Sequence, residues 1–218
     1  MAQAVSMKNV LIVLGHPNPA SFSHALAQHY EVGARLAGAH VETLELGSLA
    51  FDPVLRGTQA LEPDLLHAQA ALLRAEHVAW FFPTWWAGPP ALVKGFIDRV
   101  FLPGFAYRHD GGLLPTRLLS GRTARLVTSM DAPWLYYALW YRGALHHSFM
   151  RATLGYCGFS RVQSCTIYSM RKKTARQRER LLELSAERGA KDARSSKRSL
   201  AQLGDGTNSS KATPSTTR

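Results

Sequence analysis

The residues best suited to binding a ligand fall in three short loops of this 218-residue chain. Hydroxyl groups at the start of a helix suit a phosphate, whereas flat rings on a rigid backbone suit a planar aromatic ligand. The candidates are His16, Ser21, Phe22 and Ser23 in the first loop, Pro83, Thr84, Trp85, Trp86 and Ala87 in the second, and Thr128, Ser129 and Asp131 in the third. We predict no metal site, because the sequence has no CxxC pair and no His/Cys ligand spacing.

The first loop has the layout of a phosphate site. Residues 8–14 form a short apolar run, typical of a buried strand, and Ser21 is a good N-cap for a helix that continues to Gly38. Free N–H groups and the positive end of the helix dipole meet at such a helix start. The loop matches neither G-x-G-x-x-G nor a Walker motif. Taken alone, His16 is also typical of a structural loop residue and Ser21 of a plain N-cap.

The second loop follows the most apolar strand of the chain. Residues 78–82 predict a strand buried on both faces, and residues 91–101 resume at helical period, with Pro90 suited to the first turn. Two readings of Trp85-Trp86 stay open: the rings plug a sheet edge or a partner surface, or they border a planar ligand. Gly88 and the paired prolines would hold such a border rigid.

The remaining segments complete an α/β pattern. Strands are predicted at 40–46, 123–129 and 162–168, the first of them near a sheet edge, and helices at 62–73, 134–155 with a break near Gly143, and 175–188. Residues 102–121 read as a long irregular loop. Five repeats of strand and helix predict a doubly wound five-stranded parallel sheet, and ligands bind such sheets at the carboxyl ends of the strands.

The formal charge of +11 belongs mainly to the C-terminus. Residues 1–170 hold 13 Lys/Arg against 10 Asp/Glu, whereas residues 171–218 hold 13 against 5. We therefore predict one domain over 1–189 and a disordered basic tail over 190–218, read as a solvated appendage rather than a nucleic-acid arm.

No apolar run reaches 18 residues, which favours a cytoplasmic protein. Cys157 and Cys165 are expected to be reduced core thiols.

Together the three loops resemble those of the flavodoxin-like NAD(P)H:quinone oxidoreductases. Residues 10–17 with Ser21-Phe22-Ser23 are similar to the family's first strand and phosphate-ribose loop, and residues 82–95 to its isoalloxazine loop and following helix. Residues 105–107 and 155–159 also resemble family segments. The resemblance covers about residues 8–188.

The resemblance implies a homodimer that binds FAD or FMN, takes a hydride from NAD(P)H and reduces a quinone or similar acceptor. By this resemblance, His16, Phe22 and Ser23 contact the phosphate and ribose end of the flavin beside the Ser21 cap. Thr84 to Ala87 line the isoalloxazine, and Tyr107 is the catalytic residue that closes the pocket.

The third loop departs from the family pattern. Met130-Asp131-Ala132-Pro133 replaces a Gly-Gly pair of the animal enzymes, and the pocket tyrosine and histidine of those enzymes are not matched to Tyr136, Tyr137, His146 or His147. A different function is an accessory flavoprotein subunit that regulates a membrane transporter of the potassium-efflux type. The aromatic segment 134–141 and Trp85-Trp86 are expected to meet a partner subunit.

Overall fold

The computed structural model describes residues 7–57 and 59–194. Five parallel strands form one sheet in the order β2-β1-β3-β6-β7. They are β1 (Asn9–Leu14), β2 (His40–Glu45), β3 (His77–Pro83), β6 (Thr123–Ser129) and β7 (Arg161–Ile167). This arrangement confirms the predicted doubly wound sheet and the edge position of β2.

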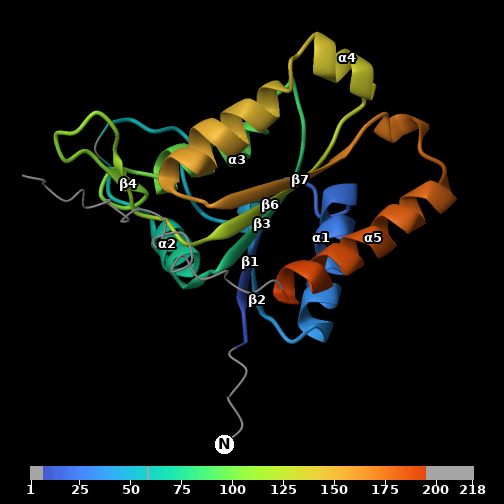
Figure 1. Cartoon of the computed structure of the whole chain (residues 1–218), viewed down its shortest axis with the longest axis horizontal. Helices are drawn as coiled ribbons and strands as arrows, with labels where there is room; N and C mark the ends of the chain where they lie inside the picture. The colour runs from blue at the N-terminus through green and yellow to red at the C-terminus, as the bar shows by residue number, and fades with distance from the viewer. Residues whose placement is uncertain (1–6, 58, 195–218) are drawn as a thin grey trace, which may run out of the picture.

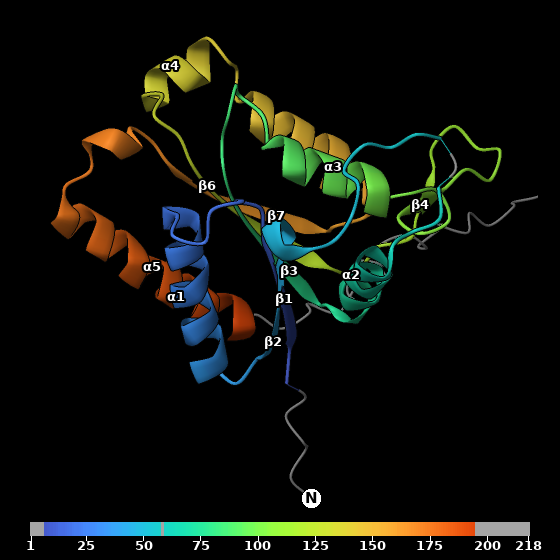
Figure 2. The ribbon, with the colours of Figure 1, turned by 180° about the vertical axis from the view of Figure 1, so that it is seen from behind.

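Helices cover both faces of the sheet (Figures 1 and 2). One face carries α1 (Phe22–Leu36) and α5 (Ala175–Arg194), and the other carries α2 (Pro63–Arg74), α3 (Ala91–Val100) and the π-helix η2 (His146–Gly155). Each face has its own apolar core, one around Tyr30 and Phe81 and the other around Trp80 and Phe96. Every residue of β3 is buried, as its unbroken apolar run predicted.

Short turns and one small hairpin lie between the larger elements. Single turns η1 (Leu46–Ser48) and η3 (Met170–Lys172) follow β2 and β7, and the predicted 102–121 loop contains a small hairpin of β4 (Tyr107–Arg108) and β5 (Thr116–Arg117). The aromatic segment forms α4 (Trp134–Leu139) and then breaks before η2, with Arg142 and Gly143 both at positive φ. The predicted break near Gly143 is confirmed.

The predicted domain boundary at residue 189 is wrong, because α5 continues to Arg194. Asp192 is only 4% exposed. Its carboxylate accepts a hydrogen bond from the Tyr30 hydroxyl at 2.7 Å and forms a two-point ion pair with Arg125 at 2.5 and 2.8 Å. Residues 190–194 are therefore part of the folded domain, and the rest of the predicted tail lies outside the described residues.

Two smaller expectations concern cysteines and membrane segments. Cys157 and Cys165 are both free thiols, and Cys157 is buried while Cys165 is partly exposed. Burial raises the pKa of the Cys157 thiol to about 11. Within residues 7–57 and 59–194, none of the helices combines the length and the apolar character that crossing a bilayer requires.

Candidate functional site

The three predicted loops converge at the carboxyl edge of the sheet, because β1, β3 and β6 are adjacent and parallel. The Gly15 N–H donates to the Phe81 carbonyl at 2.8 Å, which joins the end of β1 to β3. The Thr84 N–H donates to the Ser129 carbonyl at 2.8 Å, which joins the end of β3 to β6. Residues from three distant parts of the sequence therefore form one surface.

Gly15 allows the first two loops to approach each other. A Cβ atom at this position would collide with the side chain of Val93 on α3. The chain leaving β1 therefore passes directly against the helix that follows the second loop. Glycine is the residue that permits such a close approach.

Asn18 shapes the first loop. Its carbonyl accepts from the Ser21 N–H at 3.1 Å, its side-chain oxygen accepts from the Ala20 N–H at 2.9 Å, and its own N–H donates to His16 Nδ1 at 3.0 Å. Ser21 caps α1 as predicted, since its hydroxyl accepts from the His24 N–H. The first-turn N–H groups of Phe22 and Ser23 face out of the helix end, as in any helix start.

Two histidines lie at this helix start. His16 packs edge-to-face against Trp85, with ring centroids 5.6 Å apart, and its ring lies 6.4 Å from that of His24. His24 was missed by the sequence analysis, although its position three residues after the Ser21 cap was a usable signal. Its Nδ1 lies 2.9 Å from the Ser21 hydroxyl.

Both histidines favour the neutral form. Burial lowers the pKa of His16, helped by the neighbouring charge of His24, and burial also lowers the pKa of His24 against the opposing effect of Glu45. An anion bound at this helix end would favour protonation of both rings. The first loop therefore combines outward N–H groups with two rings that respond to a bound anion.

The second loop is a two-residue hairpin. Trp85 and Gly88 exchange two backbone hydrogen bonds of 3.0 and 2.9 Å, and the residues between them, Trp86 and Ala87, have φ of 50° and 59°. Such left-handed conformations cost non-glycine residues about 1–2 kcal/mol each. Strain of this kind is concentrated at functional sites. The hairpin holds the Trp86 side chain 98% exposed.

The third loop is fixed from both sides. The Thr128 hydroxyl lies 2.8 Å from the Thr84 hydroxyl and is buried. The Asp131 carboxylate accepts from the Arg171 N–H at 3.0 Å and pairs with the Arg171 guanidinium at 2.8 Å. The side chains of Thr128 and Asp131 are thus engaged within the protein, and Pro83 and Ser129 contribute backbone at the strand ends.

Tyr107 does not join the three loops within one chain. It follows the C-terminus of α3, and Figure 1 shows β4 on the opposite side of the molecule from α4, which follows the carboxyl end of β6. Its ring packs edge-to-face on Tyr156 with centroids 5.1 Å apart. Both tyrosines line a cavity of about 280 Å³ that also includes Leu55, Ile97 and Phe101.

The structure brings Tyr137 and His146 together, a pair that sequence reasoning left unplaced. The Tyr137 hydroxyl lies 2.9 Å from His146 Nδ1, and His146 Nε2 lies 2.8 Å from the Thr166 hydroxyl. These three residues line an open cavity of about 480 Å³ between α4, η2 and the edge strand β7. Tyr137 is buried, so it anchors α4 to the sheet.

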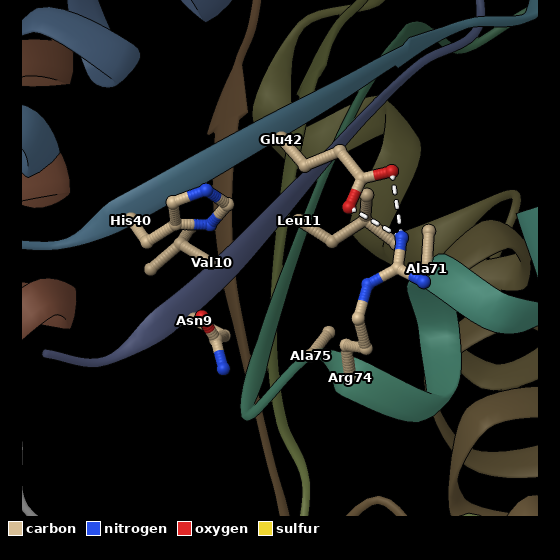
Figure 3. A pocket seen from close by; sticks show the side chains of 8 residues that line it. All are labelled: Asn9, Val10, Leu11, His40, Glu42, Ala71, Arg74 and Ala75. Carbon is tan, nitrogen blue, oxygen red and sulfur yellow. Dashed lines mark hydrogen bonds and ion pairs between the residues drawn. The ribbon is translucent and has the colours of Figure 1, made fainter. Parts of the chain in front are cut away.

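A smaller cavity lies between β1, β2 and α2, toward the amino ends of these strands (Figure 3). Its volume of about 40 Å³ is room for little more than a water molecule. Glu42 and Arg74 form an ion pair at its rim, at 2.9 Å. Nowhere in the described residues do three or more His, Cys, Asp or Glu side chains gather as metal ligands would.

Known proteins resemble this chain in sequence and fold. The sequence profile of a family described as having a flavodoxin-like fold matches residues 8–188. A Haemophilus influenzae protein named as an uncharacterized NAD(P)H oxidoreductase is 26% identical over 83% of this chain and 93% of its own length. The ribosyldihydronicotinamide dehydrogenase [quinone] of Rattus norvegicus is 29% identical, over 70% of this chain and 78% of its own. A solved structure from Streptococcus mutans UA159 has a TM-score of 0.76 and 29% identity, covering 84% of this chain and 99% of that one.

Proposed function

Because the chain belongs to the flavodoxin-like family whose profile it matches over residues 8–188, we propose that it is an NAD(P)H-dependent flavoenzyme that reduces a quinone or a similar two-electron acceptor. The observation that carries this proposal is the meeting of the three strand-end loops on one surface. The names of the relatives, an NAD(P)H oxidoreductase and a quinone-reducing dehydrogenase, support the same reaction class.

The loops suit both ends of a flavin, FMN or FAD: its phosphate end and its planar ring system. Outward N–H groups at Phe22 and Ser23 and the rings of His16 and His24 suit its phosphate. The backbone of the hairpin from Thr84 to Ala87 provides a rigid edge for its planar ring system. When bound, the flavin would supply the chemistry, accepting a hydride from NAD(P)H and passing two electrons to the acceptor.

The role of the protein is to hold and orient the flavin. Thr84 and Thr128 fix the two strand ends against each other through their hydroxyls. The strained turn at Trp86 and Ala87 sets the hairpin's shape before any ligand arrives, which lowers the ordering cost of binding. The 46% exposed ring of Trp85 and the 98% exposed ring of Trp86 leave apolar surface for a second planar molecule or a second chain.

Tyr107 can act at such a site only when a second copy supplies it, because its own chain holds it beyond the far end of α3. We therefore propose a homodimer in which the Tyr107–Tyr156 pair of one copy covers the Trp85–Trp86 hairpin of the other. Nicotinamide and acceptor would then share the space left between ring pairs and bind in turn. The flavin-containing regulatory subunit of a transporter draws no support from the relatives described above.

Mixed dimers test this arrangement. His16→Glu should abolish flavin binding in its own chain, and Tyr107→Ala should cut turnover while leaving flavin content intact. If Tyr107 acts across the dimer, mixing the two inactive variants should restore about a quarter of wild-type activity, since half the dimers are mixed and each has one complete site. A mixture as inactive as its parents would refute the shared site.

Wild-type kinetics should give parallel double-reciprocal plots with free quinone; intersecting plots would exclude alternating binding.

A further inference from the structure

The outward face of α4 is unusually apolar for a helix this short. Its exposed large side chains, with their exposed fractions, are Trp134 at 61%, Leu135 at 56%, Tyr136 at 49%, Leu139 at 70% and the adjoining Trp140 at 74%. The rings of Tyr136 and Trp140 stack with centroids 6.4 Å apart. Buried Tyr137 anchors the helix from beneath. A contiguous exposed patch of this kind marks a protein or membrane contact.

A cationic segment borders this patch. The Ser169 N–H donates to the Ala132 carbonyl at 3.4 Å and the Met170 N–H to the Met130 carbonyl at 3.1 Å, so the turn after β7 lies against the residues that lead into α4. Residues 171–180 hold six Lys or Arg and one acid, Glu179, and nine of the ten are exposed. Figure 2 shows α4 and the start of α5 at the same end of the molecule.

Some of these charges are already neutralised. Arg171 pairs with Asp131, and Arg180 pairs with Glu183 and Glu187. Across the described part of the chain, no acidic side chain pairs with the remaining four cations, Lys172, Lys173, Arg176 and Arg178. The rim of the aromatic patch therefore keeps a positive excess.

We propose that α4 and the cationic rim, residues 171–180, form a surface that docks on an anionic lipid bilayer. Tryptophan and tyrosine favour the interface between headgroups and acyl chains, leucines enter its apolar side, and lysine and arginine attract anionic headgroups. A second copy of the chain fits less well. A two-fold contact centred on this face would bring the two cationic rims together.

The proposal does not depend on the flavin. One consequence does rest on the proposed function: docking by α4 would place the strand-end loops close to acceptors dissolved in the bilayer.

Vesicle binding tests the proposal directly. The full chain should sediment with vesicles of phosphatidylcholine and phosphatidylglycerol at least about tenfold more strongly than with phosphatidylcholine alone, and salt should weaken the binding. Trp134→Ala/Trp140→Ala and Lys172→Glu/Lys173→Glu should each reduce this binding about tenfold. The matched controls are Leu36→Ala and Arg161→Glu, which replace exposed residues near the edge of the sheet where the strands begin. Both should bind the vesicles like wild type.

Two further measurements separate the possible occupants. Brominated phosphatidylcholine in the anionic vesicles should quench tryptophan fluorescence of the wild type, and the quenching should fall in Trp134→Ala/Trp140→Ala even if some binding remains. Absence of vesicle binding, or binding unchanged by both double variants, would overturn the proposal. It would equally be overturned if Trp134→Ala/Trp140→Ala dissociated a dimer in lipid-free solution, or if single-stranded nucleic acid bound the same residues more tightly than the vesicles.

Discussion

The hydroxyl oxygens of Thr84 and Thr128 lie 2.8 Å apart at the carboxyl ends of β3 and β6. This contact couples the second and third loops of the candidate site, since Thr84 begins the hairpin and Thr128 precedes Ser129 at the end of its strand. Thr128 is 1% exposed, so water cannot readily replace the bond.

Thr84→Val should lower the free energy of unfolding by about 1–3 kcal/mol, because it leaves the buried Thr128 hydroxyl without this partner. The double variant Thr84→Val/Thr128→Val should lose less than the sum of the two single changes, because neither hydroxyl is then left unpaired. Chemical denaturation of the four proteins in this cycle measures the coupling. Strictly additive losses would mean that the bond does not join the loops.

The strain in the hairpin can be relieved by glycine. Ala87→Gly should raise the free energy of unfolding by about 0.5–1 kcal/mol, because glycine adopts φ near 59° without a Cβ clash. The same replacement at Ala68, in the middle of α2, should lower it by about 1 kcal/mol. If Ala87→Gly destabilised the protein as much as Ala68→Gly, the hairpin would not be strained in solution.

Because the carboxylate of Asp192 is buried, C-terminal truncation should be tolerated only beyond this residue. Ending the chain after Ala190 removes the partner of Arg125 and Tyr30 and should lower the free energy of unfolding by about 3–5 kcal/mol, as expected when one side of a buried ion pair is lost. A chain ending after Arg194 keeps Asp192 and is the matched control. Equal melting temperatures for the two truncations would show that the ion pair carries no stability.

His77 should make the fold sensitive to acid. It lies 3.3 Å from Asp192, and burial lowers the pKa of His77 against the opposing effect of that carboxylate. The unfolded chain then binds a proton more readily than the folded one, so stability is full above the unfolded pKa of about 6.5 and falls as the pH drops below it. His77→Gln should flatten the fall between neutral pH and about pH 5. An unchanged slope in His77→Gln would contradict the assignment.

The sequence predicted the sheet well but misjudged where the folded domain ends. An unbroken apolar run in the sequence identifies a buried strand such as β3. The order of the strands in the sheet then places their loops together. Gly189 was read as the end of α5, yet a Cβ there would collide with the Tyr30 backbone, so this glycine serves a close helix crossing instead. The partners of Asp192 lie 67 and 162 residues away in the chain, and no local pattern reveals them.

The candidate site was predictable to a similar degree. The N-cap at Ser21 follows from local chemistry. The positive φ angles of Trp86 and Ala87 do not, because such conformations are usual for glycine and asparagine. The place of Tyr107 depends on the path of α3 back along the sheet, which spans about 15 Å for ten residues.

Flavin binding by the purified chain tests the central claim most directly. Protein freed of cofactor and titrated with FMN and with FAD in a calorimeter should bind at least one of them at one site per chain. His16→Glu should abolish the binding by placing a negative charge beside the phosphate. His29→Glu, at an exposed position on α1, should leave it unchanged. Folded wild-type protein that binds neither flavin would contradict the account.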